Sequence, residues 1–165
     1  YMGWSWVARG LVAHEAKAAM LRAGLVDAPI FLTPTPFNTL LWRVVILTGD
    51  GHLEGLDSVV IDEGPMQLSF FSSDTQSLEA ASDIWAVDRL RWFTRDFLEV
   101  SVRDGRLVLA DIRMGQAPVY LFSFVVAELD NPHWREIPGE AAPRSDFSLE
   151  DFGGIWTRIW TTEQR

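Results

Sequence analysis

The chain has 165 residues, of which 48% are hydrophobic and 22% are charged, and its net charge is −9. This composition is typical of a folded globular protein and excludes a disordered chain. The excess of carboxylates repels phosphate backbones and anionic lipid heads, which argues against a nucleic-acid partner. The absence of cysteine excludes disulfides, thiolate metal sites and cysteine nucleophiles. We expect one soluble domain, residues 1–165.

The N-terminal segment is apolar and aromatic. Tyr1, Trp4 and Trp6 carry rings of the kind that gather at membrane interfaces, although the same pattern is common in a helix end that packs on a core. Helical spacing predicts a helix over residues 4–23, with Gly24 as its C-terminal cap. The apolar residues on one side of this helix are Val7, Leu11, Ala18 and Leu21.

The next element is the apolar run 40–47, which follows an extended proline-containing segment. Its large and β-branched residues predict a central strand that is covered on both faces. Other strands of this half are predicted at 30–32, 52–62 and 66–72, and the turn at Asp50-Gly51 is expected to place the glycine at positive φ.

The second half begins with a capping box, in which Ser73 is followed by Gln76, and this predicts a central helix that ends near Phe93. Asp104-Gly105 predicts a second hairpin with its glycine at positive φ. The remaining elements are strands at 97–103, 106–113 and 119–129, a loop at 138–145 and a helix at 148–161.

Together these elements predict an α+β fold. It contains an antiparallel sheet of about six strands in two three-stranded meanders, with an N-terminal, a central and a C-terminal helix.

No catalytic or metal-binding cluster can be assigned from residue spacing. The three histidines, His14, His52 and His133, are scattered, and none has a second histidine four residues away, so each is expected to be solvated or hydrogen-bonded. The glycine-rich segment 49–55 joins two strands, whereas a phosphate cradle requires a helix N-terminus behind it. We therefore predict no catalytic residue, no metal ligand and no cofactor in this chain.

Arg43 stands in the middle of the apolar run 40–47. An arginine on a covered strand keeps its charge, so it requires a carboxylate or several carbonyl partners. Asp111, which also lies in an apolar run, is the predicted partner. In the alternative interpretation, Arg43 extends to the sheet edge and Asp111 caps the turn before Gly115.

Three stretches resemble segments of a known family. Residues 34–45, PTPFNTLLWRVV, are similar to a PTP-x-N-x-LLWR segment. Residues 91–97, RWFTRDF, resemble a WFS-x-GF segment, with Asp96 where glycine is usual, and residues 110–115, ADIRMG, resemble a D-x-RMG turn. The family is that of the membrane-bound metal-dependent hydrolases, which includes LexA-binding, inner-membrane-associated hydrolases (YdjM-like). The similarity runs in the same order through about residues 1–128.

The resemblance implies that the chain is a fragment that follows a bundle of transmembrane helices. In that family the bundle carries the histidine and aspartate motifs from which metal-dependent hydrolysis is inferred, so a divalent metal is implied for the full-length protein only. The implied location is the inner membrane, with the transmembrane portion of the same protein as partner. The motif residues that become candidate binding residues are Asn38, Arg43, Asp111 and Arg113.

Two classes of function follow. The first is an accessory or regulatory domain of a membrane-bound metal-dependent hydrolase, which is not catalytic by itself. The second is a stand-alone binding module for a small apolar ligand or a partner protein. A flat, exposed aromatic patch near residues 1–6 would favour the first, and a deep aromatic pocket with a few convergent polar groups would favour the second.

Overall fold

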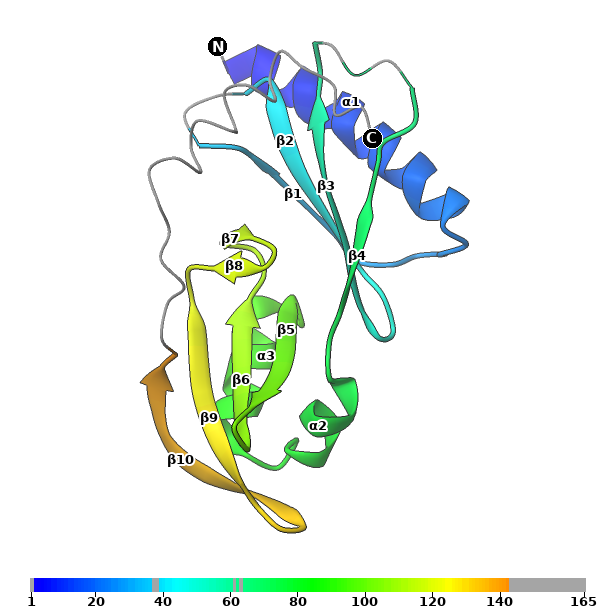
Figure 1. The fold of residues 1–165 in the computed structure, drawn as a ribbon. Helices are drawn as coiled ribbons and strands as arrows, with labels where there is room; N and C mark the ends of the chain where they lie inside the picture. The colour runs from blue at the N-terminus through cyan, green and yellow to red at the C-terminus, as the bar shows by residue number, and fades with distance from the viewer. Residues whose placement is uncertain (1, 37–38, 61, 63, 143–165) are drawn as a thin grey trace. The chain divides into compact units, whose positions relative to one another are not determined.

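The computed structural model describes residues 2–36, 39–60, 62 and 64–142 (Figure 1). These residues form an α+β fold with antiparallel sheets, as predicted. The prediction of six strands in two meanders was wrong, because the described residues contain ten strands in three sheets. The predicted C-terminal helix at 148–161 lies outside the described residues.

The helices are α1 (Met2–Arg22), α2 (Thr75–Ala80) and α3 (Trp85–Thr94). The strands are β1 (Ile30–Pro34), β2 (Leu41–Leu47), β3 (Gly51–Ser58), β4 (Ser69–Ser72), β5 (Leu98–Arg103), β6 (Arg106–Asp111), β7 (Gly115–Gln116), β8 (Val119–Tyr120), β9 (Ser123–Asp130) and β10 (His133–Ala141). The strand orders in the three sheets are β1-β2-β3-β4, β10-β9-β6-β5 and β7-β8.

The described residues divide into two compact units. The first comprises the described residues of 2–48 and 53–70, and the second comprises residues 49–52 and 71–142. Among the described helices, none is both long and apolar enough to cross a bilayer.

In the first unit, α1 lies across one face of the first sheet (Figure 1). The buried side of the helix consists mostly of small residues, which let it approach the sheet closely. The core that it forms with the sheet contains Ala8, Val12, Ala16, Ala19, Met20, Trp42, Val44 and Ile46. The apolar side seen in the sequence, which includes Val7, Leu11 and Leu21, is instead exposed. The predicted glycine cap is confirmed, because Gly24 has a φ of 74°.

The predicted central strand is confirmed as β2, and six of its seven residues are buried. Side chains point alternately to the two faces of a strand, so a strand that is covered on both faces is apolar at every position except where a polar side chain is paired, as at Arg43. β1 pairs with β2 antiparallel, from Ile30 opposite Ile46 to Pro34 opposite Trp42.

In the second unit, α2 and α3 pack on one face of the second sheet (Figure 1). The single central helix predicted from the capping box was wrong, since residues 81–84 separate two helices. The N-cap is Asp74, whose carboxylate accepts from the Ser77 amide at 2.9 Å. Ser73 does not cap the helix because its hydroxyl oxygen accepts from the amide of Val100 in β5, at 2.8 Å.

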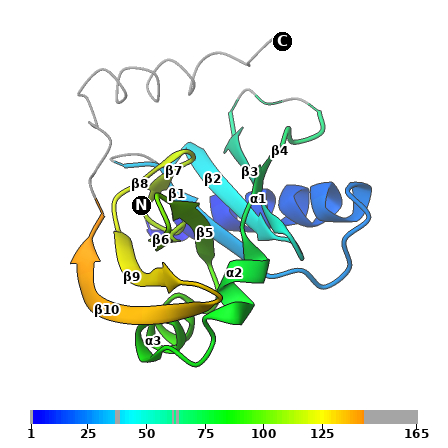
Figure 2. The ribbon, with the colours of Figure 1, turned by 60° about the horizontal axis from the view of Figure 1, so that its bottom comes forward.

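β9 and β10 form a long, curved hairpin (Figure 2). The strand predicted at 119–129 is divided into β8 and β9, and the loop predicted at 138–145 was wrong for its first four residues, which belong to β10. The β10 register shifts between Glu136 and Glu140. Such a bulge tolerates Pro138 and Gly139, because the residues in it are not held by the ladder of hydrogen bonds.

Glycine is needed for different reasons at Gly105 and at Gly51. Asp104 and Gly105 have φ values of 51° and 72°, so the predicted hairpin turn between β5 and β6 is confirmed. Gly51 is not among the described residues at positive φ, and that part of the prediction was wrong. Glycine is required there because a Cβ would collide with the backbone carbonyl of Phe71.

Candidate functional site

The four candidate binding residues do not share one set of contacts. Asn38 lies outside the described residues. Arg43 lies on β2 in the first unit, whereas Asp111 and Arg113 lie in the second. The predicted Arg43–Asp111 ion pair was wrong, because each of the two residues pairs with a different side chain.

The partner of Arg43 is Glu54 on β3, which sequence reasoning missed. The Arg43 Nε donates to Glu54 Oε1 at 2.8 Å, and Nη2 donates to Oε2 at 2.7 Å. The two residues are only 4% and 5% exposed. This is the bidentate geometry that arginine favours with a carboxylate, and it satisfies the predicted need for a buried counter-charge. Nη1 is also buried, and it has no hydrogen-bond partner among the described residues.

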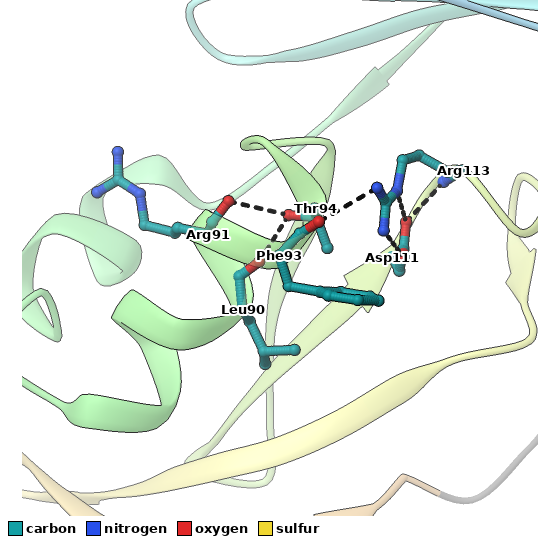
Figure 3. Close-up of polar contacts among 6 residues, drawn as sticks. All are labelled: Leu90, Arg91, Phe93, Thr94, Asp111 and Arg113. Carbon is teal, nitrogen blue, oxygen red and sulfur yellow. Dashed lines mark hydrogen bonds and ion pairs between the residues drawn. The ribbon is translucent and has the colours of Figure 1, made fainter.

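Asp111 and Arg113 form a local clip at the end of β6 (Figure 3). The guanidinium of Arg113 donates from Nε to Asp111 Oδ1 at 2.9 Å and from Nη2 to Oδ2 at 2.7 Å. The Arg113 amide donates to the same Oδ1 at 3.0 Å, which closes the turn. Hydrogen bonding to Asp111 raises the pKa of Arg113, while partial burial acts in the opposite direction.

The clip also binds the end of α3 (Figure 3). Arg113 Nη1 donates to the carbonyl of Phe93 at 3.2 Å, and the guanidinium lies 5.1 Å from the centroid of the Phe93 ring. A cation is favourable here because the last carbonyls of a helix lack partners within the helix and carry partial negative charge. The structure therefore brings together two of the motifs seen in the sequence, residues 91–97 and 110–115.

The backbone after α3 turns through the left-handed region. Arg95 and Asp96 have φ values of 56° and 62°. The Asp96 carboxylate accepts from the Nε of Arg91 at 2.7 Å, and this hydrogen bond is the first cause of a raised pKa at Arg91. Asp96 thus occupies a conformation in which glycine is the least strained residue, at the position where the resembled motif has glycine.

The contacts of Asp111 and Arg113 join parts of the fold to one another, and they do not present either side chain as a reacting group. The carboxylate of Asp111 and the guanidinium of Arg113 are both engaged in the turn, so neither is placed to transfer a proton to a substrate. No group of three or more histidine, cysteine, aspartate or glutamate side chains that could hold a metal is found among the described residues.

His52 is the most buried of the three histidines. Its side chain is fully buried, and its Nε2 atom lies 3.0 Å from the Tyr120 hydroxyl oxygen. Its ring stacks on the Phe71 ring with a distance of 5.4 Å between the ring centroids. It is thus one of the hydrogen-bonded histidines that the sequence analysis allowed.

An apolar surface on α1 is the feature that most resembles a contact site. Trp4, Val7 and Leu11 are spaced three and four residues apart along one side of the helix, and Leu21 lies on the same side beyond His14 and Ala18. We call Trp4, Val7, Leu11 and Leu21 the α1 stripe. All are exposed, Leu21 to 62%. Trp6, which lies on a neighbouring side of the helix, is exposed to 71%. The stripe is separate from the residues of α1 that pack on the sheet, so the helix is apolar on two sides.

No protein-family model, curated protein or solved structure matches this chain.

Proposed function

We propose that this chain is an accessory domain of a membrane-bound metal-dependent hydrolase, and that the α1 stripe is the surface that contacts the transmembrane portion of the enzyme. The observation that carries the proposal is the exposure of Trp4, Val7, Leu11 and Leu21 on a helix that has a separate core-packing side. An apolar face is normally covered by another element, and several exposed apolar side chains on one surface indicate a contact site.

The internal contacts of the motif residues support an accessory role. Arg43 is neutralised by Glu54, and Arg113 is held by Asp111 and by the Phe93 carbonyl. Their guanidinium groups therefore stabilise the fold and do not present an open catalytic group. Asp96 at positive φ is consistent with the glycine of the resembled motif. In this proposal the hydrolytic metal site is in the transmembrane portion, at the inner membrane.

The test compares this chain with a longer protein that includes the transmembrane portion. Both are assayed against phosphatase, esterase and nuclease substrates, with and without divalent metal. Activity is expected only in the longer protein, and only with metal. Leu11→Glu in the longer protein places a charge in the α1 stripe and should reduce that activity. Its matched control is Val102→Glu, on an exposed residue of β5, which should leave the activity unchanged.

Hydrolysis by the 165-residue chain alone would overturn the accessory role. Equal activity of the Leu11→Glu and Val102→Glu proteins would overturn the assignment of the α1 stripe as the contact surface.

A further inference from the structure

A second exposed aromatic surface lies on α3, in the other unit. Trp85, Arg89, Trp92 and Phe93 are spaced at i, i+4, i+7 and i+8, which places them on one side of the helix together with the exposed Asp88. We call Trp85, Arg89, Trp92 and Phe93 the α3 stripe. The three rings are exposed to 70%, 67% and 61%. The buried side of the helix, which includes Val87, already packs on the second sheet, so the stripe is not needed for the core.

The cation in the α3 stripe is available to an external partner. The guanidinium of Arg89 lies 4.4 Å from the centroid of the Trp92 ring, and no ion pair joins it to a carboxylate of the described residues. Its neighbour Arg91 differs, because it is paired with Glu79 and Asp96. Arg89 can therefore donate hydrogen bonds to an acceptor outside the chain while it stays stacked on the indole.

The size of the α3 stripe argues against a separate, stably bound protein, whereas the α1 stripe is proposed to contact a covalently linked part of the same protein, for which a small area is sufficient. A buried aromatic side chain contributes roughly 150–250 Å², so three rings that are about two-thirds exposed offer roughly 400 Å². A specific protein interface needs about 800 Å² from each partner. A nucleic acid is also disfavoured, because the net charge is −9 and the stripe holds a single arginine.

We propose that the α3 stripe inserts at the surface of a phospholipid bilayer. Tryptophan favours the level of the headgroups, where its ring is apolar and its N–H remains hydrated. Trp85 and Trp92 are about two helical turns apart, or roughly 10 Å, so both rings reach the headgroup region of a bilayer that lies along the helix. Arg89 between them donates to a lipid phosphate. The proposal deepens the proposed function and rests on it for bringing the chain to a membrane.

The test measures partition of the 165-residue chain into phosphatidylcholine vesicles by cosedimentation. Zwitterionic lipid is used because the acidic chain is repelled by anionic lipid. The double variant Trp85→Ala with Trp92→Ala should lower the partition coefficient by about tenfold or more. Arg89→Gln should lower it about threefold. The matched control, Val102→Ala with Leu129→Ala, removes two exposed apolar residues of the same unit and should leave it unchanged.

A second measurement separates insertion from a change in folding. Vesicles of brominated phosphatidylcholine should quench the tryptophan fluorescence of the unmodified chain. Trp85→Phe with Trp92→Phe keeps the aromatic volume and the fold, and it should bind the vesicles with most of this quenching lost.

Several results would overturn the inference. They are the absence of partition by the unmodified chain, an equal effect of the control variant, and loss of binding only when α1 stripe residues are changed. Competition by millimolar glycerol phosphate would indicate a soluble phosphate ligand. A dimer or an oligonucleotide complex that the Trp85→Ala/Trp92→Ala change abolishes would indicate a protein or nucleic-acid partner. The hydrolase assays do not involve vesicles, so failure here and failure of the proposed function are distinguishable.

Discussion

The buried Arg43–Glu54 pair gives the sharpest prediction for stability. Arg43→Met leaves the Glu54 carboxylate without its two short charge-assisted bonds of 2.8 and 2.7 Å, at a position that is 5% exposed. Loss of one partner of such a pair costs about 3–5 kcal/mol, because the remaining charge is buried without its counter-charge. Glu54→Leu strands the guanidinium of Arg43 and should cost a similar amount.

The double variant Arg43→Met with Glu54→Leu should recover most of either loss. Two apolar side chains of similar volume remove both desolvated charges, and such replacements are often neutral. They also remove the Arg43 Nη1 group, which is buried and has no partner among the described residues. The expected coupling energy of the double-mutant cycle is therefore roughly 3 kcal/mol.

The assay is urea unfolding followed by tryptophan fluorescence and circular dichroism, with the dependence on urea compared between variants. Two controls set the scale. The exposed pair of Arg135 and Glu128, at 3.2 Å, should show a coupling below about 1 kcal/mol. Arg43→Met combined with Asp111→Leu should be additive, because these residues have different partners. Additive losses in the Arg43/Glu54 cycle, or single losses below about 1 kcal/mol, would refute the reasoning.

Three further results are expected. In urea unfolding, Gly51→Ala should lower the free energy of unfolding by about 3 kcal/mol, because a Cβ at Gly51 meets the Phe71 carbonyl. Gly105→Ala should lower it by about 1 kcal/mol, because Gly105 is constrained only by its φ of 72°. A larger loss for Gly105→Ala than for Gly51→Ala would contradict these turn geometries. EDTA should leave the melting temperature unchanged, since the described residues hold no group of metal ligands; a fall of several degrees in a metal-replete preparation would count against this. Hydrogen bonding to Asp111 raises the pKa of Arg113 above its ordinary value. The stabilisation from this ion pair is therefore fully present below the unfolded pKa and is lost only as the pH rises through the folded pKa. The stability difference between the chain and its Arg113→Gln variant should thus be constant from about pH 7 to pH 10, and a steady change across that window would show that another group controls it.

The elements that could be predicted from the sequence are those fixed by local residue patterns. The apolar run that became β2 is recognisable because a strand covered on both faces has no polar side. The hairpin at Asp104-Gly105 follows from the φ values that this dipeptide tolerates. Gly24 likewise ends α1 for a local reason, since the residue after a helix often adopts the left-handed conformation.

The elements that were missed depend on contacts between distant residues. Ser73 has the sequence signature of a helix cap, but its hydroxyl oxygen accepts a hydrogen bond from the amide of Val100, which is 27 residues away. Asp74 caps the helix instead. Pro138 and Gly139 are typical of a loop, yet the bulge between Glu136 and Glu140 keeps them within β10. Neither outcome is visible in a local window of sequence.

The candidate site shows the same division. The sequence predicted a carboxylate or several carbonyls near Arg43, and the structure supplies a carboxylate. The choice of Glu54 over Asp111 depends on how β3 follows β2, since the partner comes from the neighbouring strand of the same sheet. Asp111 is instead satisfied by Arg113, two residues away, and such a local clip is difficult to distinguish in sequence from a long-range pair. The side of α1 that faces the core was missed for another reason, because both of its sides are apolar and periodicity alone does not separate them.

The contacts of the motif residues also bear on where function lies in this molecule. Residues 91–97 and 110–115 meet through Arg113 and the Phe93 carbonyl, and Asp96 lies in a backbone conformation that favours glycine. Both features are requirements of the fold, because they close the end of α3 against the end of β6. Residues with this role build the scaffold of the second unit. The α1 stripe and the α3 stripe are among the apolar surfaces that the described residues leave exposed, and the two sets of variants test each of these surfaces separately.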